Sequence, residues 1–213
     1  MGKSILITGA GRGLGKCMAD SLGADGHSLV LHRGFADGDL RDPKTTKRLT
    51  KLADSHDINI LINNAGLYMN RPFAKSKVED LNRVIATNLL SPIALTLAVW
   101  PILRRKPGSL IIFINSVAGK CGSPGELAYC ASKFGLKGFV DSLQYDAVRA
   151  KIRIVSIYLG AMRTDMTKEK GGDPMMNIDP VEVALIIKDL CKEYKGAEVS
   201  EITIDKIGKA SLK

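Results

Sequence analysis

Residues 4–15 read SILITGAGRGLG, and this stretch decides the fold. Its first part, Ser4–Thr8, is a short apolar and β-branched run, which predicts a buried strand. A glycine-rich turn follows at once, and residues 13–25 have the spacing of an amphipathic helix. The order of strand, turn and helix predicts the start of an α/β unit.

The glycines of this turn are spaced for close approach to a ligand. A strict GxGxxG pattern fails because Leu14 stands where the third glycine would fall, and the pattern present is GxxxGxG, formed by Gly9, Gly13 and Gly15. Glycine lets the backbone approach a phosphate, and a helix N-terminus offers free N–H groups and a positive dipole. Any tight turn also needs glycine for steric reasons, but the position between a first strand and a first helix favours phosphate binding.

Strand-like and helical segments alternate along the rest of the chain. Further strands are predicted at 28–32, 58–63, 109–115, 152–158 and 199–204, and helices at about 43–56, 77–104, 126–150 and 179–194. Buried strands separated by helices predict an α/β fold, with a doubly wound, mostly parallel sheet and helices on both faces. The length of 213 residues predicts a single domain, 1–213. Pro92 should kink or break the helix at 77–104.

One connection in this pattern is too short. Between His32 and Asp39 there is no room for a helix, whereas a parallel crossover needs about 10–12 residues. A strand in 36–40 therefore cannot be an ordinary parallel neighbour of the strand at 28–32. Either this edge strand is absent or it is a short non-parallel piece.

The composition excludes several classes of protein. With 45% hydrophobic and 25% charged residues, the chain can bury a core, which excludes a disordered chain and a disulfide-stapled scaffold. We expect neither a membrane-spanning helix nor a signal peptide, because no long uninterrupted apolar run occurs. The four cysteines form no CxxC pair and the three histidines lie apart, so we expect no metal site and a cytoplasmic location.

Three polar residues predict acid–base chemistry. Tyr129 and Lys133 are four residues apart on a predicted helix and therefore share one face. Ser116 ends the preceding strand, where the carboxyl ends of parallel strands form a binding crevice. A fixed ammonium lowers the pKa of a nearby phenol, as proton transfer to a carbonyl oxygen requires. Tyr-x-x-x-Lys alone is common by chance, but its combination with Ser116 and the glycine-rich turn favours catalysis.

The sequence resembles the short-chain dehydrogenase/reductase family over almost its whole length. The matching motifs are TGAGRGLG at 8–15, NNAG at 63–66, Asn88 in IATNLL, Ser116 in INSVAG, YCASK at 129–133 and LGAMRT at 159–164. The resemblance implies a Rossmann fold that binds NAD(P)(H) at the strand ends. It also implies that Tyr129 is the general acid/base and that Ser116 hydrogen-bonds the substrate oxygen. Lys133 would hold the nicotinamide ribose and lower the pKa of Tyr129, and Asn88 would support a water relay to Lys133.

The same resemblance implies a set of cofactor-binding residues. Asn64, Ala65 and Gly66 would line the cofactor channel, and Gly160 and Thr164 would lie beside the nicotinamide or the pyrophosphate. The whole expected set is Gly9, Gly11, Arg12, Gly13, Leu14, Gly15, Arg33, Asp39, Leu40, Asn64, Ala65, Gly66, Tyr129, Lys133, Gly160, Met162 and Thr164.

Three departures from the family pattern are visible. Leu159 stands where the family usually has a proline before Gly160. The family's usual helix between the second and third strands, at the edge that frames the adenine, is missing. The stretch 165–178 is short for a substrate-covering loop, and it fits a mobile lid and an ordinary surface loop equally well.

Charge at the end of the second strand favours NADP(H) as cofactor. NAD-preferring sites usually place an acidic residue there to bind the ribose hydroxyls. Here His32 and Arg33 occupy that place, the first acid is Asp37, and Arg12 lies in the glycine-rich turn. Two guanidiniums suit a 2′-phosphate. Asp39 and Leu40 resemble the family's adenine-contacting pair.

The leading hypothesis is therefore an NADP(H)-dependent oxidoreductase that reduces a carbonyl or oxidises an alcohol. A sugar-nucleotide epimerase is disfavoured, because only 55 residues follow position 158 and such relatives carry a sizeable C-terminal substrate domain. An inactive dinucleotide-sensing or RNA-binding protein remains the alternative, suggested by the net charge of +9. The expected partners are a small-molecule substrate, without nucleic acid or membrane, and further copies of the chain.

A homodimer or homotetramer is expected through the helices at 77–104 and 126–150. In this interpretation the apolar residues of these helices cover more than the helix face that packs on the core. They are Leu81, Ile85, Leu89, Phe134, Val140 and Leu143. The substrate itself is not readable from the sequence, and Tyr68 fits a substrate contact and a rim aromatic equally well.

Overall fold

A computed structural model describes residues 2–165, 177–192 and 197–206, and within them six strands form one sheet. Their order is β2-β1-β3-β4-β5-β6, and every pairing is parallel. The strands are β1 (Ser4–Thr8), β2 (Ser28–His32), β3 (Ile60–Asn63), β4 (Leu110–Ser116), β5 (Arg153–Leu159) and β6 (Glu201–Ile204). Because the order reverses at β1, a crevice opens between β1 and β3 at their carboxyl ends.

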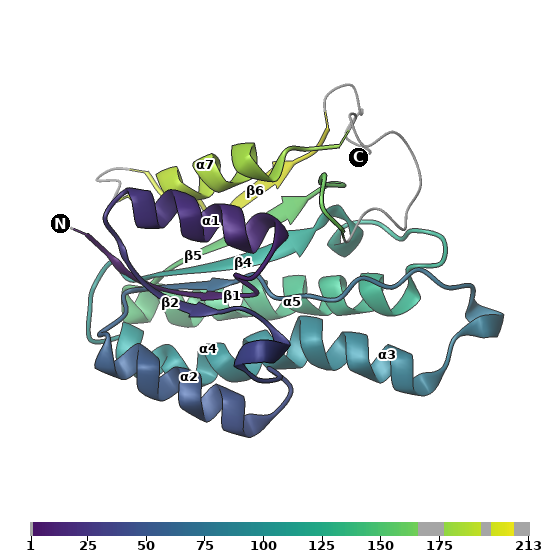
Figure 1. Ribbon diagram of the computed structural model, residues 1–213, viewed down its shortest axis with the longest axis horizontal. Helices are drawn as coiled ribbons and strands as arrows, with labels where there is room; N and C mark the ends of the chain where they lie inside the picture. Colours follow the sequence, from purple (N-terminus) through teal and green to yellow (C-terminus); the bar gives the residue numbers. More distant parts are fainter. Residues whose placement is uncertain (1, 166–176, 193–196, 207–213) are drawn as a thin grey trace.

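Helices cover both faces of this sheet (Figure 1), which confirms the doubly wound α/β fold. One face carries α1 (Gly13–Ala24) and α7 (Pro180–Leu190), whose Met18, Leu22 and Ile187 join one apolar core. The other face carries α2 (Pro43–Ser55), α3 (Val78–Ile85), α4 (Ser91–Leu103) and α5 (Leu127–Ala150). Buried side chains of α2, α4 and α5 fill a second core on that face, with Leu49, Val99 and Leu136 among them.

For the short connection after β2, the sequence left open whether the edge strand is absent or is a short non-parallel piece. In the described chain no strand lies outside β2, and the place of the family's edge strand is taken by a single 3-10 turn, η1 (Phe35–Asp37). The helix that would separate β2 from such an edge strand is missing, as expected. The predicted helix at 43–56 forms as α2 and carries the chain directly from β2 to β3. Asp42 caps α2 by accepting a hydrogen bond from the Lys44 N–H.

Pro92 does not break the long helix, so of the expected kink or break the break is wrong. A π turn, η3 (Ala86–Leu90), joins α3 to α4, and Pro92 lies in the first turn of α4. Proline has no N–H to donate, and the first turn of a helix tolerates this loss. Within the wider π turn, the Ser91 hydroxyl donates to the Ala86 carbonyl at 2.8 Å. The segment Val78–Leu103 is therefore one continuous helical rod, and its π turn carries Asn88.

This rod is long and apolar enough to cross a membrane by length and composition. Its Leu95, Val99 and Leu103 are buried against the sheet, as in the core helix of a soluble protein, so the property is weak support for membrane insertion. The expected outer apolar set needs correction, because Val140 is buried in the core and, of that set, only Phe134 is exposed, at 44%. The others, Leu81, Ile85, Leu89 and Leu143, are half-buried.

Candidate active site

A cleft of about 710 Å³ lies at the carboxyl ends of the strands. It runs from η1 beside β2 to the loop that precedes α5, so it spans the crevice expected from the strand order. Of the expected site residues, all but Asn88 line this cleft. The fold therefore brings together segments that are more than 100 residues apart in the sequence.

The glycine-rich turn forms one wall of the cleft. Gly9 and Gly13 have positive φ angles of 69° and 51°, which side chains other than glycine rarely adopt. A Cβ on Gly15 would lie 2.0 Å from the Gly9 carbonyl oxygen, and one on Gly11 would lie 2.5 Å from the Arg33 carbonyl oxygen. The helix α1 begins with neither a side-chain cap nor an acidic residue in its first turn, so no side chain of that turn offsets the positive end of its dipole.

Thr8 and Asn64 fix the second wall to this turn. The Asn64 side-chain amide donates to the carbonyls of Thr8 and Gly9, at 2.9 and 3.1 Å. In return the Thr8 hydroxyl accepts from the N–H groups of Asn64 and Ala65, at 3.0 and 3.1 Å. The NNAG segment and the glycine-rich turn are thus held as one unit. Thr8 belongs to the glycine-rich motif, but this role could not be predicted from the sequence because its partner Asn64 lies 56 residues away.

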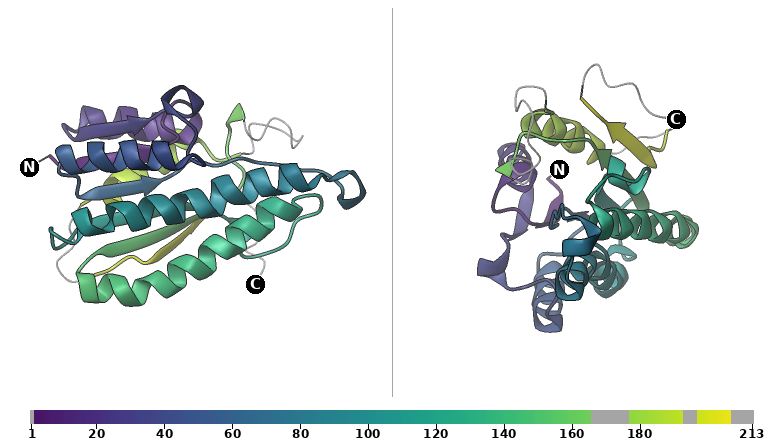
Figure 2. Two further views of the ribbon diagram at one scale, coloured as in Figure 1. Left: turned by 90° about the horizontal axis from the view of Figure 1, so that it is seen from below. Right: turned by 90° about the vertical axis from the view of Figure 1, so that its right-hand side faces the viewer.

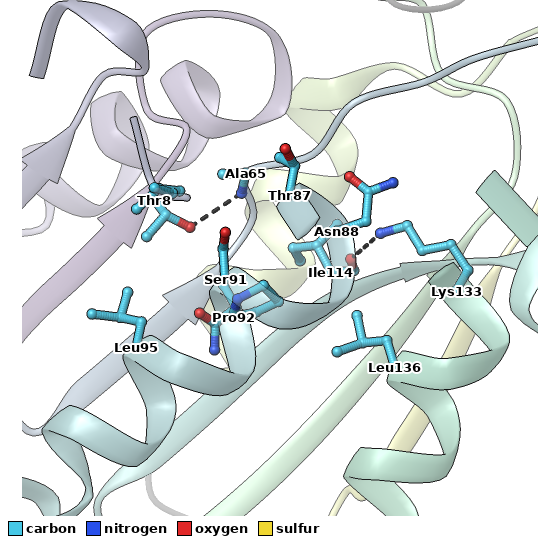
Figure 3. A pocket seen from close by; sticks show the side chains of 12 residues that line it. Thr8, Ala65, Thr87, Asn88, Ser91, Pro92, Leu95, Ile114, Lys133 and Leu136 are labelled. Carbon is cyan, nitrogen blue, oxygen red and sulfur yellow. Dashed lines mark hydrogen bonds between the residues drawn. The ribbon is translucent and has the colours of Figure 1, made fainter. Parts of the chain in front are cut away.

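Ser116, Tyr129 and Lys133 meet at the far wall. Ser116 ends β4 with its side chain 8% exposed, and Tyr129 and Lys133 lie on the first turns of α5. The Lys133 ammonium lies 5.8 Å from the centre of the Tyr129 ring. It donates to the Ile114 carbonyl at 2.9 Å (Figure 3). The spacing of four residues thus places both groups on one face of the helix, as predicted.

Burial shifts both titrating groups away from their ordinary values. It raises the pKa of Tyr129 to about 12, while a hydrogen bond with Ser116 opposes this shift and the charge of Glu126 adds to it. The lowering by Lys133 that was expected from the sequence is therefore not found in the protein without its cofactor, where burial is the largest cause. Burial lowers the pKa of Lys133 to about 8, because the residue is only 6% exposed. A phenol and an amine with perturbed pKa values in one cleft are typical of a catalytic site.

Asn88 lies behind this wall rather than in it. Its side-chain amide donates to the Leu67 carbonyl at 2.8 Å and to the Ser132 hydroxyl at 3.1 Å, and its oxygen accepts from the Leu67 N–H at 2.7 Å. With Lys133, Asn88 lines a small separate cavity of about 10 Å³ (Figure 3). That volume is about the lower limit for one water molecule.

The expected adenine end carries exposed cations. Arg12 and Arg33 are both exposed, and the backbones of Gly11 and Arg33 touch, so the two arginines lie at the same end of the cleft. The Asp37 carboxylate accepts from the Arg33 N–H at 2.6 Å. Asp39 lines the cleft, but its carboxylate is held by Arg41, which lowers the pKa of that carboxyl.

The segment after β5 lines the cleft between its two ends. The Gly160 N–H donates to the Ile204 carbonyl at 2.9 Å, and a Cβ on Gly13 would lie 3.4 Å from the Thr164 methyl. Met162 pairs with Ile178 in an isolated parallel bridge. The expected loop at 165–178 lies mostly outside the described residues, since 166–176 are not described.

One residue of the cleft was missed by sequence analysis. The Glu126 side chain is 2% exposed and accepts a hydrogen bond from the Tyr68 hydroxyl at 2.9 Å. Its position three residues before Tyr129 was the only signal available in the sequence. The fold also settles the place of Tyr68, whose ring lies edge-on to the Tyr129 ring with centres 5.2 Å apart.

Comparison with known proteins identifies the family of the chain. Residues 32–174 match the short chain dehydrogenase family. The chain is 32% identical to the 3-oxoacyl-(acyl-carrier-protein) reductase FabG of Escherichia coli strain K12, with 83% of this chain and 80% of that protein covered. It is 28% identical to the corresponding reductase of Synechocystis, with 94% of this chain and 93% of that protein covered.

Solved structures share the fold at lower identity. An alcohol dehydrogenase from the archaeon Thermococcus sibiricus, complexed with 5-hydroxy-NADP, superposes with a TM-score of 0.85 at 20% identity and full coverage of both chains. A short-chain dehydrogenase from Streptomyces avermitilis gives 0.83 at 20% identity, covering 96% of this chain and 89% of that one. With the family match over two thirds of its length, the chain belongs to the short-chain dehydrogenase/reductase family of oxidoreductases.

Proposed function

We propose that this protein is an NADP(H)-dependent reductase of a carbonyl substrate, with Tyr129 as the general acid. The observation that carries the proposal is the meeting of Ser116, Tyr129 and Lys133 on one wall of a cleft whose opposite wall is a glycine cradle. The curated relatives named above are reductases of 3-oxoacyl groups, which supports reduction rather than oxidation as the reaction.

The residues of the cleft fit a dinucleotide. Gly9, Gly11 and Gly15 let the turn pack closely on its own chain, since a Cβ at each would meet backbone atoms at 2.9 Å or less. The same turn lines the cleft, where a pyrophosphate would lie against its backbone. The uncapped N-terminus of α1 supplies the positive end of a helix dipole to the same place. Arg12 and Arg33 supply two cations for a 2′-phosphate, and neither guanidinium has an ion-pair partner in the described part of the chain.

The chain's own residues then perform the proton chemistry. Bound NADPH supplies the hydride. Tyr129 donates its proton to the carbonyl oxygen, and the Ser116 hydroxyl hydrogen-bonds the same oxygen. The Lys133 ammonium favours the phenolate that results, because an opposite charge lowers the pKa of a phenol. Asn88 and the small cavity beside Lys133 provide the place for a water molecule that returns a proton to this pair.

We further propose a cytoplasmic homodimer or homotetramer. The support is an exposed apolar stripe on α5, formed by Leu127, Phe134, Tyr145 and Val148, together with the exposed Leu97 of α4. The long rod Val78–Leu103 and α5 lie side by side on the same face of the molecule (Figure 2). An inactive sensing or RNA-binding role gains no support from the cleft, where the acid–base residues meet.

The proposed function is tested by replacing Tyr129 with phenylalanine. We expect NADPH oxidation with ketone and aldehyde substrates to fall by about 10²- to 10⁴-fold, because the proton donor is lost while the ring remains. NADPH affinity, measured by calorimetry, should change little. Retention of most turnover by the Tyr129→Phe protein would overturn the mechanism.

A further inference from the structure

Phe35 is an exposed aromatic residue in the wall of the cleft. It belongs to the turn η1, it lines the cleft together with Arg12 and Arg33, and it is 70% exposed. Single exposed apolar residues are common on protein surfaces. What distinguishes Phe35 is its position in a concave site, where aromatic side chains contact ligands.

Backbone and side-chain hydrogen bonds fix the turn that carries this ring. The Asp37 N–H donates to the Gly34 carbonyl at 2.9 Å, and the Gly38 N–H donates to the Phe35 carbonyl at 3.1 Å. The Asp37 carboxylate in turn accepts from the Arg33 N–H at 2.6 Å. The chain on either side of Phe35 therefore has a defined conformation.

The same turn is tied to the rest of the fold. The buried His32 ring donates from Nε2 to the Gly38 carbonyl at 2.8 Å, and the Arg48 guanidinium of α2 donates to the Asp37 carbonyl. A Cβ on Gly38 would lie 2.5 Å from the Thr45 Oγ1 atom, so the backbone of the turn packs closely against α2. A ring presented by a fixed backbone loses little conformational entropy when a ligand binds to it.

The neighbours of Phe35 indicate the chemistry of its ligand. In the described chain β2 is the edge of the sheet, so residues 32–40 bound this end of the cleft. Of the apolar and aromatic residues among them that line the cleft, His32 is buried and Leu40 is half-buried, whereas Phe35 is exposed. An exposed aromatic ring beside two exposed guanidiniums suits a phosphorylated nucleoside, whose base stacks on the ring while its phosphate pairs with the cations.

The direction of the cofactor in the cleft identifies this nucleoside. Hydride transfer requires the nicotinamide to lie beside Tyr129, and the pyrophosphate lies against the glycine-rich turn in the proposed function. The other end of the dinucleotide, which carries the adenine and the 2′-phosphate, then lies at Phe35, Arg12 and Arg33.

We propose that Phe35 stacks on the adenine ring of NADP(H), so that the turn η1 provides the wall for the base at the open edge of the sheet. The inference rests on the proposed use of NADP(H) and adds the residue that binds the base. Stacking contacts the face of the base, so it strengthens binding of the adenosine half without touching the reacting end of the cofactor.

Two matched ligands separate stacking from phosphate binding. Adenosine 2′,5′-bisphosphate contains the base and the 2′-phosphate, and ribose 2,5-bisphosphate is the same sugar phosphate without the base. For Phe35→Ala we expect the Kd of adenosine 2′,5′-bisphosphate, measured by calorimetry, to rise by about 5- to 150-fold, the range for loss of one base–aromatic stack. The Kd of ribose 2,5-bisphosphate should not change.

Two further variants control this measurement. Phe35→Tyr keeps an aromatic ring and should keep the affinity for adenosine 2′,5′-bisphosphate. Phe73→Ala removes another exposed phenylalanine, which is 81% exposed in the turn η2 (Phe73–Lys75) and does not line the cleft, so it should change neither Kd.

Fluorescence gives a second readout that depends on neither turnover nor a weakened complex. In the Phe35→Trp protein the new indole should be quenched by adenosine 2′,5′-bisphosphate, because the base stacks on it, and not by ribose 2,5-bisphosphate. Phe73→Trp is the control and should show no quenching by either ligand. This readout tests the inference even if Phe35→Ala fails to fold.

The outcomes separate the inference from the proposed function. An unchanged Kd of adenosine 2′,5′-bisphosphate in Phe35→Ala, an equal loss of both ligands, or a Phe35→Trp protein that binds without quenching overturns the stacking and leaves the use of NADP(H) standing. Failure of the unaltered protein to bind NADPH and adenosine 2′,5′-bisphosphate overturns the proposed cofactor, and the inference falls with it.

Discussion

Lys133 is the residue at which catalysis and stability oppose each other. Burial lowers its pKa from 10.5 to about 8, so between these two pH values the unfolded chain binds more protons than the folded chain. The free energy of unfolding should therefore rise with pH from about 8 to 10.5, while below pH 8 the full cost of the buried ammonium is present.

Replacement of Lys133 by methionine should remove this dependence. We expect Lys133→Met to abolish turnover and to stabilise the cofactor-free protein at pH 7 by up to about 3 kcal/mol, the value of the pKa shift. Denaturant unfolding at several pH values measures both effects, with the exposed Lys51→Met on α2 as control. Unfolding free energies of the unaltered and Lys133→Met proteins that run parallel from pH 7 to 10.5 would contradict the assignment.

Arg12 and Arg33 carry the prediction of cofactor preference. If both face a 2′-phosphate, NADPH should bind more tightly than NADH by about 10- to 100-fold, or roughly 1.5–3 kcal/mol. Both side chains are exposed, so added salt should narrow the difference. Calorimetry of both cofactors should show the preference lost or reversed by Arg12→Ala with Arg33→Asp, and kept by Arg104→Ala. Equal affinities of the unaltered protein at low salt would refute the role of these arginines.

Among single residues, the sequence predicted those whose role follows from local spacing or from a motif. Tyr129 and Lys133 follow from helical spacing, and Gly9 from its place between strand and helix. Glu126 could not be found in this way, because its burial and its contact with Tyr68 depend on packing between segments 58 residues apart. The pKa directions of Tyr129 and Lys133 likewise follow from burial, which the sequence does not contain.

Among the elements, the glycine-rich turn is the least tolerant of change. Gly15→Ala would place a Cβ 2.0 Å from the Gly9 carbonyl oxygen and 2.7 Å from the Asn64 amide nitrogen. We expect the free energy of unfolding to fall by about 1–3 kcal/mol and NADPH binding to be lost, because the added Cβ would force the glycine-rich turn and the NNAG segment apart. Gly138→Ala on α5, where a Cβ meets nothing within 4 Å, should instead gain about 0.5–1 kcal/mol. Thermal unfolding with and without NADPH checks both, and equal behaviour of the two variants would contradict the packing argument.

Elements were predictable where periodicity decides and less so where an irregular turn intervenes. The strands and helices lie within a few residues of their predicted bounds, because alternating buried strands and amphipathic helices leave a clear pattern. Pro92 was expected to kink or break the helix, yet the helix continues through the π turn at 86–90. No local sequence signal distinguishes a π turn from a kink, since its cost is offset by the tertiary contacts of Asn88.

For the whole molecule, the exposed apolar stripe on α5 predicts association. Leu127, Phe134, Tyr145 and Val148 are separated by seven, eleven and three residues, all near whole numbers of helical turns. Sedimentation should show a dimer or tetramer, and Leu97→Glu with Val148→Glu should give a monomer because the charges disrupt an apolar interface. Leu185→Glu on α7, on the other face of the sheet, is the control. A strict monomer at high concentration would contradict the prediction.

The central claim is hydride transfer to a carbonyl carbon with Tyr129 as the proton donor. Its most direct test uses NADPH deuterated at the transferring position, with ketone and aldehyde substrates, and mass spectrometry of the alcohol formed. The account predicts one deuterium in the alcohol made by the unaltered protein, and almost no labelled alcohol from Tyr129→Phe at equal NADPH occupancy. Alcohol without deuterium, or equal labelled product from both proteins, would contradict it.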